Sequence, residues 1–161
     1  MKKIPLTRGK YAIVDDEDYE WLTQWSWCYN NRYAIRGMSR GGVQKKFPMH
    51  REIMKTPIGL ETDHINGNTL DNRKSNLRIC THKENGRNRK VSKNKKWSEY
   101  KGVTYRTDRR VWITQIRKDN RLYKVGYFKN ELEAALTYDI WAVKFFGKYA
   151  KLNFNAKGAA I

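Results

Sequence analysis

Residues 1–50 alternate short apolar runs with polar segments, in a pattern that predicts a small α+β unit. The apolar run at 11–14 predicts a strand, and the acidic residues at 15–20 favour the start of a helix directly after it. Gly41 and Gly42 stand between two apolar stretches and predict the turn of a β-hairpin. The tryptophans of this segment are expected in its core: Trp21, Trp25 and Trp27.

The pattern then changes to two short strands around a polar loop. A strand ending at 62–64 leads into a loop rich in Asn and Gly at 65–72, and the apolar run at 77–80 predicts a second strand. Thr81 and Glu84 have the spacing of a capping box, so a helix is expected to begin after Thr81. The predicted order is strand, loop, strand, helix.

The last third of the chain predicts a sheet followed by one helix. Runs at 102–106, 111–117 and 122–128 predict three strands. Asn130 is a helix N-cap residue, and Gly147 is expected to end the helix that follows. The sequence therefore predicts a three-stranded antiparallel sheet packed on one helix.

The composition is strongly basic and points to a polyanionic partner. The chain has 161 residues, with 34 Lys and Arg against 16 Asp and Glu, which gives a formal net charge of +18. Nucleic acid is the commonest polyanion that such a surface attracts. An aromatic content of 13% argues against a disordered basic tail. Five of the acids gather near the N-terminus: Asp15, Asp16, Glu17, Asp18 and Glu20.

Membrane and secreted classes do not fit the sequence. No apolar run approaches the ~18 residues of a membrane-spanning helix, and the N-terminus lacks the apolar stretch of a signal peptide. A basic amphipathic helix that would suggest a membrane surface is also missing. Cys28 and Cys80 lie far apart, and without a Cys-x-x-Cys pair no zinc finger is expected. Their pairing stays open, but reduced thiols in the cytoplasm are the simpler interpretation.

Three residues around the polar loop suit phosphodiester hydrolysis, which needs a base to activate water and a metal to neutralise the phosphate. His64 can accept a proton near neutral pH, and Asp63 offers an oxygen ligand for a hard cation. Because neighbours on a strand point to opposite faces, they can serve one site only if the chain bends there, as the Asn/Gly run allows. The amide oxygen of Asn85 can complete a site for Mg²⁺. An Asp-His pair alone is more often a surface hydrogen-bonding pair.

A longer pattern around this pair resembles the HNH nucleases of phages and mobile introns, over residues 45–90. The matching segments are Asp63-His64-Ile65-Asn66-Gly67-Asn68, Leu70-Asp71-Asn72-Arg73, Ser75-Asn76-Leu77-Arg78, Asn85 and Asn88. The resemblance implies a ββα-metal motif in which His64 is the general base and Asn76 pins the loop by hydrogen bonds to backbone. Asn85 stands where the family often has a final His, as in a His-Asn-Asn branch of homing endonucleases. Asp63 and Asn85 would then hold one divalent metal, and oxygen ligands favour Mg²⁺ or Mn²⁺ over Zn²⁺.

The two other histidines and a further asparagine have open interpretations. His50 is a candidate phosphate contact or support for the site, but a partly buried structural histidine is favoured. His82 lies near the start of the helix and is interpreted as an exposed helix residue. Asn88 is a candidate for the metal shell, although Asn85 fits the spacing better.

A second resemblance covers the C-terminal sheet and helix, which are similar to the plant APETALA-type or ethylene-response-factor DNA-binding domain. The matching residues are Tyr100-Lys101-Gly102-Val103, Trp112, Gln115-Ile116-Arg117, Val125-Gly126-Tyr127-Phe128, Glu133-Ala134-Ala135, Tyr138-Asp139 and Ala150-Lys151-Leu152-Asn153-Phe154. The resemblance carries DNA contacts over to Thr104, Arg106, Gln115, Arg117 and Lys124. Thr104 and Lys124 stand where the family usually has Arg or Trp, so the plant target sequence is not carried over.

The alternation along the second strand of this module agrees with a DNA-reading face. Trp112, Thr114 and Ile116 would face the helix, while Ile113, Gln115 and Arg117 would face outward. Arg reads guanine and Gln reads adenine in the major groove of double-stranded DNA. The outward face would hold several cations and no acid, which argues against an ordinary solvated sheet.

These observations divide the chain into four parts. They are an HNH nuclease domain at 1–90 (an N-terminal α+β unit at 1–50 and the ββα-metal motif at 51–90), a basic linker at 91–97, the DNA-binding module at 98–154 and a tail at 155–161. The basic run around the linker adds phosphate contacts from Arg87, Arg89 and Lys90, although such a run is usually solvated.

The sequence therefore predicts an α+β, metal-dependent, site-preferring DNA endonuclease encoded by a phage or mobile element, acting in the cytoplasm of a bacterial host. One alternative is a non-catalytic, sequence-specific DNA-binding regulator whose nuclease motif has decayed. Another is a basic RNA- or ribosome-binding protein. Target sequence, nicking against double-strand cleavage and biological role stay open. A monomer is favoured over an oligomer, and no membrane partner is expected.

Overall fold

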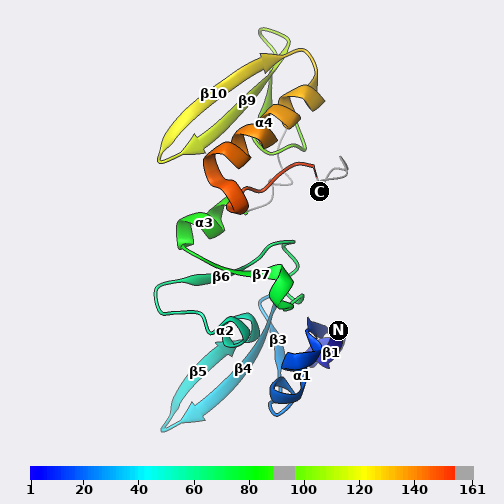
Figure 1. Ribbon diagram of the computed structural model, residues 1–161, viewed down its shortest axis with the longest axis vertical. Helices are drawn as coiled ribbons and strands as arrows, with labels where there is room; N and C mark the ends of the chain where they lie inside the picture. The colour runs from blue at the N-terminus through cyan, green and yellow to red at the C-terminus, as the bar shows by residue number, and fades with distance from the viewer. Residues whose placement is uncertain (89–96, 155–161) are drawn as a thin grey trace. The chain divides into compact units, whose positions relative to one another are not determined.

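The computed structural model describes residues 1–88 and 97–154, and the chain divides into two compact units, Met1–Asn85 and Gly86–Ile161 (Figure 1). Both units combine short helices with small antiparallel sheets, so the predicted α+β class is confirmed at this level. Within the described ranges, no helix is long and apolar enough to cross a membrane.

The first unit opens with a two-stranded sheet that the hydrophobic pattern predicted only in part. β1 (Lys2–Pro5) pairs antiparallel with β2 (Tyr11–Val14), the strand that the apolar run indicates. β1 was not predicted because Ile4 is its one core residue, and Ile4 becomes buried only through pairing opposite Ala12. α1 (Asp16–Leu22) follows β2, as the acidic start indicated.

A three-stranded meander and a short helix complete this part of the first unit. The elements are β3 (Cys28–Asn30), β4 (Tyr33–Arg40), β5 (Val43–Pro48) and α2 (Met49–Met54). Gly41 and Gly42 connect β4 to β5 with φ angles of 57° and 78°. Two consecutive positive φ angles are typical of the tight hairpin turn that the sequence predicted.

The tryptophan prediction was right for Trp27 and wrong for Trp25. Trp27 is buried beside Leu22 and Met49, and its indole N–H donates to the carbonyl of Leu22 at 2.8 Å. Trp25 follows the end of α1 and is 38% exposed, and the Arg36 guanidinium lies 4.5 Å from its ring centre. Because the helix stops at Leu22, helical spacing no longer places Trp25 on the buried face.

The remaining elements of the first unit follow the predicted order of strand, loop, strand and helix. They are β6 (Glu61–His64), a short 3-10 helix η2 (Lys74–Asn76), β7 (Leu77–Cys80) and α3 (His82–Arg87). The capping box is present, because the Glu84 carboxylate accepts from the Thr81 N–H at 2.8 Å and the Thr81 hydroxyl accepts from the Glu84 N–H at 3.3 Å. These contacts fix where α3 begins, one residue after Thr81.

The second unit consists of a three-stranded antiparallel sheet and one long helix. Its elements are β8 (Val103–Arg106), β9 (Val111–Lys118), β10 (Arg121–Phe128) and α4 (Glu131–Phe146), and the strand order is β10-β9-β8. The Asn130 side chain caps α4 by accepting from the Leu132 N–H at 2.7 Å. Gly147, with φ 52°, ends the helix as expected.

One face of this sheet packs on α4, as the alternation along β9 predicted. The Thr114 hydroxyl donates to the Ala134 carbonyl of the helix at 2.6 Å, and Trp112 and Ile116 pack against helix residues on either side of it. Ile113 was expected on the outward face, yet it is 4% exposed. Tyr127 of β10 and Thr104 of β8 lie opposite Ile113 in the sheet. Alternation along a single strand does not show such neighbours.

Candidate active site

Asp63 and His64 are the last two residues of β6, and both are buried. Asp63 lies opposite Arg78 of β7, which donates to Oδ2 of Asp63 from Nε at 2.9 Å and from Nη2 at 2.6 Å. The two side chains are only 8% and 12% exposed. Removing one partner of such a buried pair costs about 3–5 kcal/mol, because the other charge stays buried. Arg78 therefore fixes the direction of the Asp63 carboxylate.

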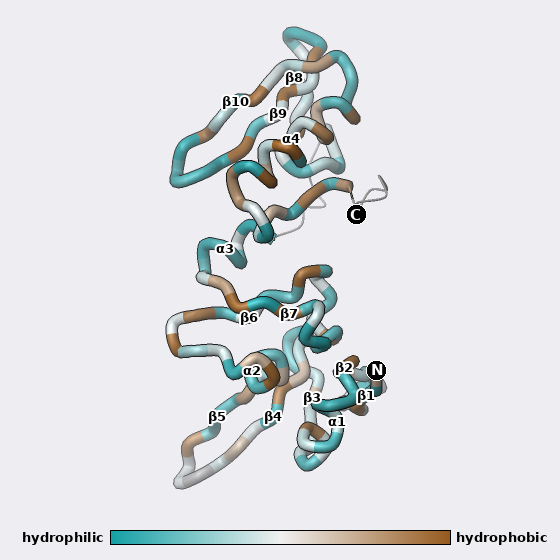
Figure 2. Tube along the Cα trace, viewed as in Figure 1, coloured by the Kyte–Doolittle hydropathy of each residue, from teal (hydrophilic) through white to brown (hydrophobic). Residues whose placement is uncertain are grey.

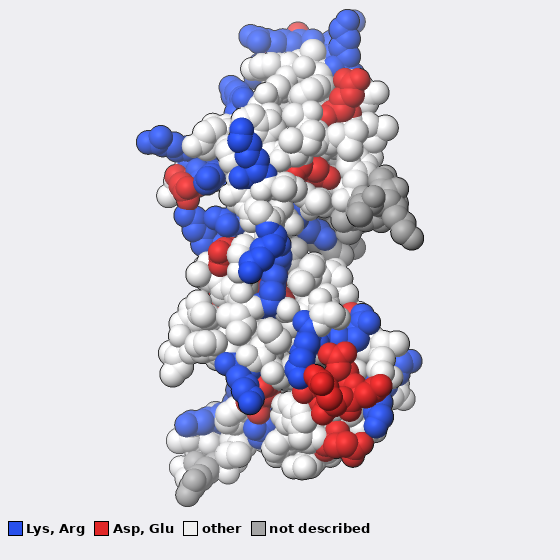
Figure 3. Space-filling model, in the orientation of Figure 1, with Lys and Arg blue, Asp and Glu red and all other residues white. Residues whose placement is uncertain are grey.

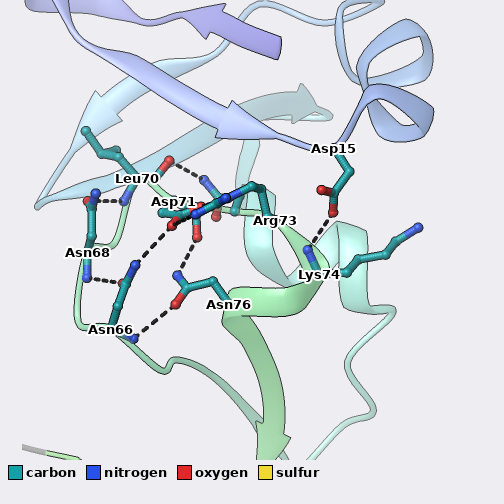
Figure 4. Close-up of polar contacts among 9 residues, drawn as sticks. Asp15, Asn66, Asn68, Leu70, Asp71, Arg73, Lys74 and Asn76 are labelled. Carbon is teal, nitrogen blue, oxygen red and sulfur yellow. Dashed lines mark hydrogen bonds and ion pairs between the residues drawn. The ribbon is translucent and has the colours of Figure 1, made fainter. Parts of the chain in front are cut away.

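The loop that follows His64 is organised by its own asparagines (Figure 4). Asn76 accepts from the Asn66 N–H at 3.0 Å and donates to the Asp71 carbonyl at 2.8 Å, so one side chain bridges both halves of the loop. The Asn66 side chain donates to the Asp71 carboxylate at 3.0 Å and accepts from the Asn68 N–H at 2.7 Å. The asparagines are residues typical of a simple turn, but here their hydrogen bonds hold the loop in one defined conformation.

The N-terminal strands hold this loop from outside. Ile13 of β2 donates its N–H to the Leu70 carbonyl at 2.8 Å and accepts from the Asn72 N–H at 2.7 Å. The Lys74 N–H donates to the Asp15 carboxylate at 2.8 Å, and the Lys74 ammonium lies 2.6 Å from Glu17. Figure 3 shows the acidic side chains gathered over α1, so this cluster is partly an anchor for the loop.

Asn72 fixes the ring of His64. The Asn72 amide nitrogen donates to the Leu70 carbonyl at 3.3 Å, which leaves its oxygen to face Nε2 of His64 at 3.2 Å. An amide oxygen only accepts, so Nε2 carries the proton, and Nδ1 is the accepting nitrogen of the neutral ring. Asn72 is 0% exposed, so the contact is shielded from water.

Two aromatic rings flank His64 on the side of α2 and β4. The His50 ring lies 5.0 Å from the His64 ring in an edge-to-face arrangement, and the Tyr33 ring lies 6.1 Å away. Burial lowers the pKa of His64 below its usual value, although Asn72 and nearby acids act in the opposite direction. Burial also lowers the pKa of His50 to about 3. Burial among these rings thus favours the neutral form of His64.

His50 is buried, as the favoured structural interpretation expected. Its Nδ1 has no hydrogen-bond partner among the described residues. A neutral, buried imidazole of this kind packs as an aromatic ring and holds no charge for a phosphate.

Asn85 is placed by Glu61 rather than by Asp63 directly. The Asn85 amide nitrogen donates to Oε2 of Glu61 at 2.6 Å, and Nδ1 of His82 lies 2.7 Å from Oε1 of the same carboxylate. Asn85 and His82 both lower the pKa of Glu61. Glu61 and Asp63 are two positions apart on β6 and so point to the same face. Asn85 and Asp63 therefore lie at the same face of β6.

The donor set on this face fits a hard divalent cation in its chemistry. Asp63 supplies a carboxylate, and the amide of Asn85 gives its nitrogen to Glu61, so its oxygen is the atom able to face a metal. Mg²⁺ is typically held by one or two protein oxygens and several waters. Among the described residues no group of three or more His, Cys, Asp or Glu could hold a metal.

The candidate DNA contacts of the second unit share the sheet face opposite α4. Gln115 and Arg117 alternate with the helix-facing residues of β9, and Lys124 of β10 lies in register opposite Gln115. Thr104 of β8 lies opposite Ile113 and completes the same face. Arg117 and Lys124 are exposed, and Thr104 and Gln115 are half-buried.

Arg106, the fifth candidate on this face, is paired with an acid of the adjoining turn. Arg106 donates from Nε and Nη2 to the two carboxylate oxygens of Asp108, both at 2.7 Å. The pairing lowers the pKa of Asp108 to about 2. The guanidinium fork that would read guanine is thus occupied by a neighbour in the turn, which sequence alternation cannot show.

The basic run between the two motifs is described only at its start. The Arg87 guanidinium lies 4.5 Å from the ring centre of Phe146, and both residues belong to the second unit. Arg89 and Lys90 lie outside the described residues, as do most of the predicted linker and the predicted tail.

Sequence reasoning missed Asn72 and Glu61. Asn72 was part of the family pattern but received no role, and its signal was its place between Asp71 and the loop's end. Glu61 carried no motif signal beyond its position two residues before Asp63. His82 is exposed, with 83% of its side chain accessible, but it also contacts Glu61.

Comparison with known proteins adds two findings. Residues 55–87 match the model of the HNH endonuclease family, a segment that contains Asp63, His64, Asn76 and Asn85. An uncharacterized HNH endonuclease of Acanthamoeba polyphaga mimivirus is 26% identical over 152 residues, which cover 91% of this chain and 76% of that protein. With 91% coverage, the similarity includes most of both units. Both findings support a nuclease of the HNH class.

Proposed function

We propose that the chain is a metal-dependent endonuclease that hydrolyses phosphodiester bonds of double-stranded DNA. The observation that carries the proposal is the buried contact between Nε2 of His64 and Asn72, which orients the His64 ring directly after Asp63. A neutral histidine whose ring is oriented by a hydrogen bond has the form that a general base needs. The matching HNH family and the basic charge support DNA as the substrate.

His64 acts as the general base. Its lowered pKa keeps the ring neutral at pH 7, so Nδ1 can take a proton from water while Nε2 keeps its own proton on Asn72. The resulting hydroxide attacks the phosphorus, and the bond to the 3′ oxygen breaks. The leaving 3′ oxygen gains a proton from solvent, so the products carry a 5′-phosphate and a 3′-hydroxyl.

Asp63 and Asn85 would hold the divalent cation, with Mg²⁺ favoured and Mn²⁺ an alternative. A cation bound there supplies charge for the phosphate and for the leaving oxygen. Arg78 and Glu61 position these two side chains through the contacts described above. Asn76 keeps the loop closed, so that His64 and Asp63 remain at the end of β6.

The second unit would supply most of the DNA affinity and the site preference. Its outward face presents Thr104, Gln115, Arg117 and Lys124 on a three-stranded sheet of the size that fits a major groove. This arrangement supports the proposed ethylene-response-factor-like module at 98–154. Enzymes that combine site preference with an HNH motif are typically encoded by phages or mobile elements. We propose such an element as the source of this chain.

A plasmid-nicking assay tests this function. The full-length chain should convert supercoiled DNA to nicked or linear forms with Mg²⁺ and should be inactive in chelator. Mapping the ends should show 5′-phosphates. A chain that binds plasmid DNA but never cuts it under any divalent metal would contradict the proposal and favour a DNA-binding regulator.

A further inference from the structure

Helix α4 carries an apolar row on the side that faces away from its own sheet. The sheet-facing side is closed by Ala134, Ala135, Tyr138 and Ala142, which are all buried. The opposite side exposes Leu132 at 49%, Leu136 at 51%, Ile140 at 68% and Val143 at 51%. Figure 2 shows apolar stretches recurring along α4. The helix is therefore apolar on two sides, and among residues 97–154 only one of them is covered by its own unit.

The spacing makes these four side chains one continuous row. Steps of four, four and three residues follow the surface of a helix with 3.6 residues per turn, so the row spans most of α4. Contiguous apolar rows of this kind usually mark a contact surface, whereas single exposed apolar residues need no explanation.

The charges beside the row are arranged with opposite signs at its two ends. Glu133 is exposed near the start of α4 and Lys144 is exposed near its end. If a second α4 lies antiparallel on the first, Leu136 of each copy meets Ile140 of the other, and Leu132 meets Val143. Glu133 of each copy then meets Lys144 of the other. A parallel arrangement would place like charges together.

We propose that α4 is a self-pairing surface, and that a second copy of this chain is its partner in an antiparallel, two-fold symmetric contact. The row is self-complementary about a point between Leu136 and Ile140, which is the requirement of a closed two-fold interface. This goes beyond the nuclease function and departs from the monomer that the sequence favoured.

The contact is small, so it is expected to be weak in dilute solution. Four side chains per copy bury less than the ~1,200 Å² of a standard stable interface. Two copies bound to one DNA molecule raise each other's effective concentration, which is how a weak contact becomes significant. The expected outcome is a dimer that forms at high protein concentration or on DNA with two half-sites.

Charge exchange across the interface provides the test. Sedimentation of the full-length chain at rising concentration should show a monomer–dimer equilibrium. Glu133→Lys alone and Lys144→Glu alone should each weaken it, by roughly 5- to 30-fold, since each replaces two attractive pairs with two repulsive ones. An equimolar mixture of the two variants should dimerise like the unmodified chain, because both pairs between the two different copies are again attractive, one in its original orientation and one with reversed sign.

The mixture distinguishes pairing between copies from effects within one helix. The two residues are about 16 Å apart along one helix axis, too far to contact each other. Leu136→Gln should remove the dimer, and Ile58→Gln, a change at a fully exposed isoleucine outside α4, should leave it intact. Circular dichroism shows whether each variant stays folded.

Three results would overturn the proposal. One is a monomer at every concentration and also in crosslinking on DNA. Another is a mixture that dimerises no better than its two components. The last is a crosslink from a Leu136→Cys variant to residues 1–85 of the same chain, which would make the first unit the occupant of the row. Because none of these measurements uses cleavage, they stand apart from the proposed nuclease activity.

Discussion

The loop at 65–76 and the outward sheet face of the second unit are both polar, but they use their polar groups in opposite ways. In the loop, asparagine side chains contact one another and nearby backbone, and Asn72 and Asn76 are buried. On the sheet face, Arg117 and Lys124 extend into solvent. A catalytic group needs fixed neighbours, whereas a surface that reads DNA needs donors able to move onto base edges. The two regions can therefore be tested separately.

The largest expected effect is on cutting alone. His64→Ala should lower the cleavage rate by ~10²–10⁴-fold, because the general base is lost, while DNA affinity stays unchanged. Single-turnover cleavage and gel-shift binding measure the two quantities on the same preparation. Cleavage within about threefold of the unmodified chain would rule out His64 as the base.

Asn72 should control the pH dependence of cleavage. The lowered pKa of His64 keeps the base neutral, so the rate should fall only as pH drops through that lowered value. Asn72→Asp keeps an acceptor for Nε2 but adds a negative charge, which raises the pKa of His64 and moves the acid limb of the profile to higher pH. Asn72→Leu removes the acceptor and should cost about 10–100-fold in rate, as loss of an orienting partner commonly does.

Nitrogen NMR separates this role from simple support of the fold. The unmodified chain and Asn72→Asp should show the imidazole proton of His64 on Nε2, and Asn72→Leu should show a mixture of tautomers. An Nδ1-protonated ring in the unmodified chain would refute the assignment.

Acid should weaken the first unit through His50. Its folded pKa of about 3 lies below the value of 6.5 in an unfolded chain, so the unfolded state binds a proton first as pH falls. Stability that is complete above pH 6.5 is thus lost progressively towards pH 3, by about 2 kcal/mol at pH 5. His50→Phe should reduce this loss in urea unfolding at pH 7 and pH 5. His82→Phe, at an exposed position, is the matched control and should leave it unchanged.

Arg117 and Lys118 are neighbouring cations on opposite faces of β9, and together they test whether the outward face reads the DNA sequence. Arg117→Ala should reduce discrimination between sequences by about 1–3 kcal/mol. Lys118→Ala should leave the preferred sequence unchanged, because the Lys118 ammonium lies 4.9 Å from the Phe145 ring on the helix side. Selection of bound DNA from a random library measures the sequence preference of both variants. Equal effects of the two substitutions would show that the face does no reading.

The smallest effect is expected at Arg106, whose guanidinium is bound by Asp108. Asp108→Asn removes the carboxylate that binds Arg106 and should strengthen DNA binding severalfold at most, because an exposed ion pair contributes little. Titration at several salt concentrations measures the change. Weaker binding by this variant would mean that Asp108 holds Arg106 in its reading position.

The sequence predicted correctly those elements that depend on residues close together in the chain. The capping box at Thr81 and Glu84, the glycine hairpin turn and the Asn130 cap depend on residues within a few positions of each other. Trp25 was misplaced because helical spacing was extended past the point where α1 ends. The pairing of Arg106 with Asp108 was missed because alternation along a strand says nothing about the turn that follows it.

For the candidate site, the sequence by itself singled out the candidate residues: Asp63, His64 and Asn85 through residue type and position, and Asn76 through the resemblance to HNH nucleases. Only the tertiary structure decided how they are held. β2 reaches across to bind the loop at Leu70 and Asn72, and the side chain of Asn72 in turn faces Nε2 of His64. Such contacts join segments far apart in the chain, and a hydrogen bond exists only once folding has brought its donor and acceptor within 3.2 Å or so of each other.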